Sequence, residues 1–146
     1  MRLIVTGHDN LGRSIVVSDQ HLAESGMVSL FTANLADPDV VVAAAAPHIA
    51  SVPNSGSVSW MFVDVSPEDQ MRAALAQGVV GIDADGWHTT PTIDFVHITS
   101  GTIMLALDTI EVELHAGDCV VQRATRHAWR NTTATPVRLA ALMVSL

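Results

Sequence analysis

Short runs of β-branched and aliphatic residues alternate with polar, turn-forming residues along most of the chain. Two such runs, at 3–6 and 14–18, flank a cluster rich in Gly, Asp and Asn, and this pattern predicts a β-hairpin. Further runs at 28–34 and 58–65 predict two more strands. Between them, residues 36–56 contain three prolines and an alanine run, so we expect irregular surface chain there.

One segment has the signals of a helix. Ser66 is a candidate N-cap, Pro67 fits the first helical position, and two acidic residues follow in the first turn. Residues 70–77 are good helix formers, and Gly78 supplies a C-terminal stop. Because so short a helix is marginal by itself, we expect it to pack an apolar face against the rest of the fold.

Beyond residue 88 the strand signals lie closer together. The predicted strands cover residues 92–99, 102–107, 110–114, 119–122 and 138–145. Several short strands separated by turns are typical of a β-sandwich or β-barrel. We therefore expect one all-β domain over residues 1–146, with an N-terminal strand arm at 1–57 and a barrel at 58–146.

Composition narrows the class of protein. Apolar residues make up 49% of the chain and charged residues 15%, which indicates a globular protein rather than a disordered one. Lysine is absent and the net charge is −8, which disfavours nucleic acids and anionic membranes as partners. The chain has no apolar run long enough to span a bilayer, no signal-peptide pattern and a single cysteine, so we expect a cytoplasmic protein.

Two groups of residues in the C-terminal half carry the candidate chemistry. The first group consists of His88, Thr90, Asp94 and Gly101. The second group consists of Gly117, Gln122, Ala124, His127 and Asn131. Their spacing resembles the two motifs of the cupin family, which have the forms G-x5-H-x-H-x3,4-E-x6-G and G-x5-P-x-G-x2-H-x3-N. We refer to them as the first and second motifs.

The chain departs from these motifs at several positions. Thr90 occupies the second histidine position of the first motif, and Asp94 replaces its glutamate. In the second motif, Gln122 stands near the proline position and Ala124 at the glycine position. The segment 117–131 is similar to that of a subgroup of small single-domain cupins, some of whose fungal relatives are named cupin-domain oxidoreductases of secondary metabolism.

The resemblance implies a jelly-roll β-barrel that holds a divalent transition metal through His88, Asp94 and His127. Two imidazoles and one carboxylate on one side of a metal form the facial triad of non-haem iron oxygenases. We therefore favour iron, while zinc, manganese and nickel suit the same ligands. The residues expected to line the substrate pocket are Thr90, Gln122 and Trp129.

The alternation of side chains along a strand predicts which residues reach the interior. Asp94 and His97 lie on opposite faces of their predicted strand, so His97 is expected to be structural and to face away from the site. Of the neighbours Gln122 and Arg123 only one can face the cavity, and we favour Gln122 inside and Arg123 on the surface. Cys119 lies in an apolar strand without a basic sequence neighbour, which favours a buried, unreactive thiol.

Each candidate also has a purely structural interpretation. Asp94 can cap a turn or pair with an arginine, and Thr90 can satisfy the edge of the barrel. Trp129 can belong to the ordinary core. Trp87, directly before His88, can close the mouth of the barrel or cover the predicted helix.

The function we favour at this point is a metal-dependent enzyme that performs oxidoreductase or dioxygenase-type chemistry on a small organic molecule. One alternative is a metal-dependent lyase, such as a decarboxylase, dehydratase or isomerase, acting on a carbonyl compound at the same site. Another is a cupin that binds a small ligand without catalysis, which the loss of the second histidine at Thr90 supports. The resemblance also implies a homodimer.

Overall fold

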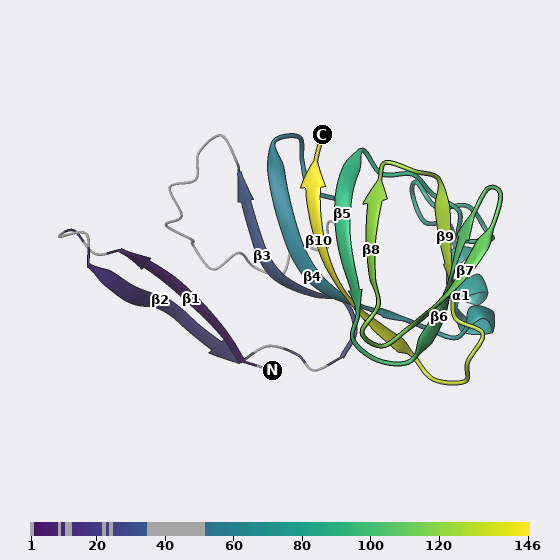
Figure 1. The fold of residues 1–146 in the computed structure, drawn as a ribbon, viewed down its shortest axis with the longest axis horizontal. Coiled ribbons are helices and arrows are strands. Elements are labelled where there is room, and N and C mark those ends of the chain that lie inside the picture. Colours follow the sequence, from purple (N-terminus) through teal and green to yellow (C-terminus); the bar gives the residue numbers. More distant parts are fainter. Residues whose placement is uncertain (1, 9, 11–12, 22, 24, 35–51) are drawn as a thin grey trace.

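The computed structural model describes residues 2–8, 10, 13–21, 23, 25–34 and 52–146. Within them it contains ten strands and one short helix (Figure 1). These elements are β1 (Arg2–His8), β2 (Ser14–His21), β3 (Val28–Asn34), β4 (Ser57–Val65), α1 (Glu68–Leu75), β5 (Thr92–Ile98), β6 (Thr102–Leu107), β7 (Glu111–His115), β8 (Cys119–Arg123), β9 (His127–Arg130) and β10 (Val137–Ser145). The prediction of an all-β chain with one short helix is therefore confirmed.

Every strand pairing is antiparallel, and the strands form three sheets. The largest sheet has the order β3-β4-β10-β5-β8, and a three-stranded sheet has the order β7-β6-β9. Strands β1 and β2 pair with each other in a separate hairpin, which Figure 1 shows extending away from the other strands.

The core lies between the two larger sheets. Their inward-facing residues form one hydrophobic cluster, which includes Met61 of β4, Val96 of β5, Leu105 of β6 and Leu139 of β10. Alternate residues of β5 and β10 are buried, as expected for strands with one face on a core. Because both sheets pack onto one cluster, the strands that carry the candidate site are held in a fixed arrangement relative to each other.

Gly101 shows why the first motif ends in glycine. The residue forms the turn between β5 and β6 with a φ of 80°, a backbone conformation that favours glycine. A Cβ atom at this position would lie 2.9 Å from Cγ2 of Val137. The position therefore requires glycine both for its backbone and for the packing of β10 beside it.

The predicted elements match observed ones closely, apart from the start of the helix, and β9 is a strand that was not predicted. The strands predicted at 28–34 and 102–107 have those bounds in the structure. Of the irregular segment expected at 36–56, residues 36–51 lie outside the described part of the chain. Among the described residues, no helix has the length and apolar character needed to cross a membrane.

The prediction that Ser66 caps the helix is wrong. Helix α1 has Pro67 as its N-cap residue and no side-chain capping hydrogen bond. The backbone N–H of Glu68 instead donates to the carbonyl of Asn131, 2.9 Å away. A loop distant in sequence thus satisfies the helix terminus, which local sequence patterns do not reveal.

Candidate functional site

One end of the inner face of the five-stranded sheet is polar. Ser59, Met143, Asp94 and Gln122 are in register on β4, β10, β5 and β8, and all four are buried. The next inward-facing row consists of Met61, Ala141, Val96 and Val120. We call the first set the polar row; the apolar row beneath it belongs to the core.

The polar row includes one residue that the sequence analysis missed. Ser59 is buried on β4, between the outward-facing Val58 and Trp60. Its strand was predicted from a β-branched and aromatic run, in which a serine carries no signal of its own. Only the pairing of β4 with β10, and of β10 with β5, places Ser59 in line with Asp94.

His88 and His127 meet at the same end of the barrel. Their backbones form an isolated antiparallel bridge in which each N–H donates to the carbonyl of the other residue at 3.0 Å. The centroids of the two imidazole rings are 4.2 Å apart. The fold therefore brings together the histidines of the two motifs, as the predicted site requires.

Both imidazole rings are held in one tautomer. Nδ1 of His88 lies 2.9 Å from the carbonyl oxygen of Gly86, and Nδ1 of His127 lies 2.9 Å from that of Thr125. A carbonyl oxygen can only accept, so each Nδ1 must carry the proton. Each Nε2 then presents its lone pair, which is how histidines are commonly oriented by backbone carbonyls in metal sites.

Burial sets the protonation of His127 and shifts the pKa of Asp94. His127 is 3% exposed, and its burial lowers the pKa to about 4; the hydrogen bond to Thr125 opposes this effect and the charge of His88 adds to it. The neutral imidazole that a metal requires is therefore the form present at neutral pH. Burial also raises the pKa of Asp94, while Thr92 and His88 act in the opposite direction.

Three buried polar atoms of the polar row have no hydrogen-bond partner in the described chain. They are Oδ1 of Asp94 and both Oε1 and Nε2 of Gln122. Leaving a buried polar atom unpaired costs about 1–3 kcal/mol, so these atoms indicate a place for a bound group. The hydroxyl of Thr90 is already engaged, because it lies 2.7 Å from the hydroxyl of Thr92.

Imidazole and carboxylate donors such as those of His88, His127 and Asp94 suit a divalent transition metal, but the described side chains are not assembled into a metal site. Across the described ranges, no three His, Cys, Asp or Glu side chains are grouped closely enough to hold a metal ion. His88 and His127 are adjacent, and Asp94 interacts electrostatically with His88. The ligand set of two imidazoles and one carboxylate therefore stays a prediction.

Trp129 lies beside the histidine pair. Its ring meets that of His127 edge-on, with 6.1 Å between the centroids, and it also packs against the hydrophobic core. It also lines a small hollow with Gly86 and Leu75. The residue thus contacts both the candidate site and the core.

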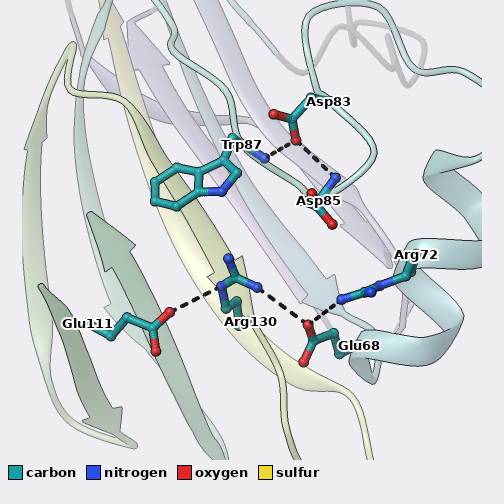
Figure 2. A network of polar contacts seen from close by, with 7 residues as sticks. All are labelled: Glu68, Arg72, Asp83, Asp85, Trp87, Glu111 and Arg130. Carbon is teal, nitrogen blue, oxygen red and sulfur yellow. Dashed lines mark hydrogen bonds and ion pairs between the residues drawn. The ribbon is translucent and has the colours of Figure 1, made fainter. Parts of the chain in front are cut away.

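A network of charged side chains holds the loop that carries His88. The guanidinium of Arg126 lies 4.1 Å from the centre of the Trp87 ring and forms an ion pair of 2.7 Å with Asp108. Arg130 lies 5.8 Å from the same ring (Figure 2). Trp87 is therefore in contact with arginines on either side of His127 in the sequence, which ties together the segments that carry the two histidines.

The same network reaches α1 and β7. Arg130 forms ion pairs with Glu68 at 3.5 Å and with Glu111 at 3.4 Å, and Glu68 also pairs with Arg72 at 3.0 Å (Figure 2). Exposed ion pairs contribute little individually, and Arg130 is only partly buried. The network links α1 to β9 and β7 beside the site.

The outward-facing residues of β5 and β8 test the alternation argument. His97 and Arg123 are exposed and Gln122 is buried, so the predicted directions of these three side chains are confirmed. The prediction of a buried Cys119 is wrong, because the thiol lies on the outer face and is exposed. Its Sγ is 3.3 Å from Nδ1 of His97, a neighbour that strand pairing creates.

Two positions of the second motif are structural. Asn131 is 1% exposed and forms four side-chain hydrogen bonds that join the loop after β9 to the end of β4. Ala124 has a φ of 52°, the only positive value at a non-glycine residue in the described chain. The glycine of the motif would be unstrained there, so Ala124 keeps the backbone shape at some cost in energy.

Residues 79–145 match the family model described as the cupin domain. The chain contains a cupin domain. The matched segment holds both motifs, the histidine pair, Asp94 and Gln122. The mostly β architecture is likewise the jelly-roll-like fold of cupins.

A curated protein matches a short part of the chain. Over 50 residues the chain is 42% identical to Oryzines biosynthesis cluster protein J of Aspergillus oryzae, a match that covers 34% of this chain and 28% of that protein. The chain thus matches well under two thirds of the length of this relative.

Part of the chain also matches solved structures at low TM-scores. The cupin domain of an XRE family transcriptional regulator from Enterobacter cloacae is 17% identical, with a TM-score of 0.43 over 61% of this chain and 82% of that one. The DMSP lyase DddQ from Ruegeria pomeroyi is 18% identical, with a TM-score of 0.44 over 60% of this chain and 38% of that one.

Proposed function

We propose that this cupin is a metal-dependent enzyme that acts on a small organic molecule, with His88, Asp94 and His127 as metal ligands. The observation that carries the proposal is the pairing of the two histidines. Their Nδ1 atoms bond to backbone carbonyls, which leaves both Nε2 atoms to bind a metal. The unpartnered Oδ1 of Asp94 supplies a carboxylate close to His88.

A divalent transition metal in this site would supply Lewis-acid or redox chemistry. Among the candidate metals we favour iron and oxidoreductase chemistry, with zinc, manganese or nickel as alternatives. The similarity to a protein named for a biosynthesis cluster supports a small organic molecule as substrate. The chain contributes the buried end of the barrel: Trp129 shields one side of His127, and the apolar row beneath the polar row excludes water.

Two other functions use the same residues. A lyase acting on a carbonyl compound needs the same open metal site, and turnover without oxygen would distinguish it from an oxygenase. A cupin that binds a ligand without catalysis is favoured by Thr90 at the second histidine position, whose hydroxyl is bonded to Thr92.

Metal content tests the proposal directly. Untagged protein should contain close to one metal per chain by elemental analysis, and the variants His88→Ala and His127→Ala should each lose it. His97→Ala is the matched control, because that histidine is exposed on the outer face of β5. A wild-type protein that takes up no metal even after reconstitution, or two histidine variants that retain it, would refute the proposed function.

We also propose that the chain forms a homodimer through the outer face of the five-stranded sheet. Trp60, Leu142, Phe95 and Val121 are in register across β4, β10, β5 and β8, and they are 41%, 36%, 48% and 57% exposed. An apolar row that spans four strands is typical of an interface rather than of a solvated surface.

The charges on this outer face favour a second copy of the chain as the partner. Two chains of net charge −8 repel each other over most of their surfaces. Asp64 is the one acidic residue on the outer face of these four strands, and Arg138 neutralises it at 2.7 Å. Two copies can therefore approach through this face without opposing acidic groups.

The molecular mass in solution tests the dimer. Light scattering after size-exclusion chromatography should give twice the chain mass for the wild type and the chain mass for Phe95→Glu. Val112→Glu is the control, because Val112 is an exposed valine on β7, in the other sheet. A monomeric wild type, or a dimer that survives Phe95→Glu, would contradict this interface.

A further inference from the structure

We infer that Gln122 is also a ligand of the metal, and that its Oε1 atom supplies the donor that Thr90 does not. This inference rests on the proposed function, because it needs a metal at the histidine pair. It assigns Gln122 a direct role in metal binding instead of a position in the pocket wall.

The placement of Gln122 is the first argument. Its side chain is 3% exposed and points inward from β8, and it lies directly opposite Asp94 of β5 in the antiparallel pair. Asp94 in turn interacts with His88, and the ring of His88 is 4.2 Å from that of His127. A continuous chain of neighbours therefore runs from Gln122 to the histidine pair.

The unsatisfied amide is the second argument. Two residues of the second motif, Asn131 and Gln122, have buried side-chain amides that differ in their hydrogen bonding. Asn131 uses its amide in four hydrogen bonds to the chain, whereas neither polar atom of the Gln122 amide has a partner in the described chain. A buried amide without partners in the chain is costly unless a bound group satisfies it.

The ligand count is the third argument. In the described parts of the chain, His88, Asp94 and His127 are not grouped closely enough to hold a metal ion by themselves, so a further oxygen donor would complete the ligand set. The hydroxyl of Thr90 is hydrogen-bonded to that of Thr92. Oε1 of Gln122 and Oδ1 of Asp94 are the two unpartnered oxygens of the polar row.

The resulting donor set consists of two imidazole nitrogens, one carboxylate oxygen and one amide oxygen. Carboxylate and carbonyl oxygens suit manganese, and imidazoles suit iron, nickel and zinc, so the mixed set favours an iron or manganese site over a tetrahedral zinc site rich in sulfur. The amide nitrogen Nε2 then remains to donate a hydrogen bond to the organic molecule.

Cobalt(II) binding to the metal-free, full-length protein tests the inference without any substrate. Isothermal titration gives the Kd, and the visible absorption bands of the bound ion report its ligands. Gln122→Leu removes the oxygen donor at similar volume and should raise the Kd at least about tenfold and change the bands. Gln122→Glu keeps an oxygen donor and should bind at least as tightly as the wild type.

Arg123→Gln is the control, because Arg123 is the outward-facing neighbour on the same strand. Circular dichroism verifies that each variant is folded, and Gln122→Asn, whose arm is shorter by one methylene, replaces Gln122→Leu if the latter does not fold. A wild-type Kd and spectrum in these variants, together with loss of cobalt in His127→Ala, would overturn the role of Gln122 and leave the proposed function standing. A wild-type protein that binds no cobalt would overturn both.

Discussion

The buried amide of Asn131 is expected to be one of the largest single polar contributions to the stability of the barrel. Its nitrogen donates to the carbonyls of Val65 and Thr135 at 2.9 and 2.8 Å. Its oxygen accepts from the backbone N–H and the hydroxyl of Thr133 at 2.9 and 2.7 Å. The side chain thus joins the end of β4 to the loop between β9 and β10.

Replacing Asn131 with alanine removes all four bonds. Each hydrogen bond contributes about 1 kcal/mol net, and the buried carbonyl of Val65 would lose its bond to the Asn131 amide. Water can reach the more exposed end of the loop and recover part of this loss. We therefore expect Asn131→Ala to lower the free energy of unfolding by roughly 3 kcal/mol.

Urea denaturation followed by circular dichroism measures this difference. Thr133→Ala is the companion variant, because it removes the hydroxyl bonds to Asn131 and Thr135 at the partly exposed end of the loop. It should cost about 1 kcal/mol. The double variant should cost less than the sum of the two single variants, because they share one bond.

A change of less than about 1 kcal/mol in Asn131→Ala, with an unchanged dependence on urea, would refute the reasoning. It would mean that water replaces the four bonds and that the loop contributes little to the stability of the barrel.

Three further predictions concern single residues. Ala124→Gly should raise the free energy of unfolding by up to about 1 kcal/mol, and with it the melting temperature, because glycine relieves a backbone strained at a φ of 52°. A lower melting temperature would contradict this. The Arg138 hydrogen bond holds the pKa of Asp64 below 3.8, so the ion pair stabilises the protein above that pH and its contribution is lost as the pH falls through the folded-state pKa. Asp64→Asn should therefore be less stable than the wild type at neutral pH, and urea titrations should show the gap closing in acid. If the proposed dimer forms, Cys119 should react readily with a thiol reagent in monomeric Phe95→Glu and more slowly in the wild type, since it lies on the face that this dimer would cover. Equal rates would argue against that face.

The sequence was informative wherever one residue pattern decides the structure. Alternation along β8 correctly predicted that Gln122 points inward and Arg123 outward, because neighbouring side chains of a strand always face opposite sides. The same rule places Cys119 outside with Arg123, whereas the apolar composition of the strand favours a buried thiol. Its exposure is a consequence of alternation, not of hydropathy.

The remaining features depend on contacts between distant segments. The partner of the α1 terminus is the carbonyl of Asn131, and no pattern near Ser66 could reveal it. The contact of His97 with Cys119 and the alignment of Ser59 with Asp94 both depend on strand register. Register across a sheet is set by the whole fold. The sequence could therefore indicate the two histidines of the site, but not that Ser59 lies in the same row as Asp94.

The division of the inner face into a polar row and an apolar row separates two kinds of evolutionary constraint. Under the proposed function, substitutions at Ser59, Asp94 and Gln122 would alter what the barrel binds, while Met61 and Val96 in the row beneath keep the sheets together. Both rows lie on the same strands, so side chains of the polar row can be replaced without a change in the backbone that carries the apolar row. A scaffold of this kind can acquire new ligand specificity through a few side chains, and a mutant library confined to the polar row would explore that change while the packed core is retained.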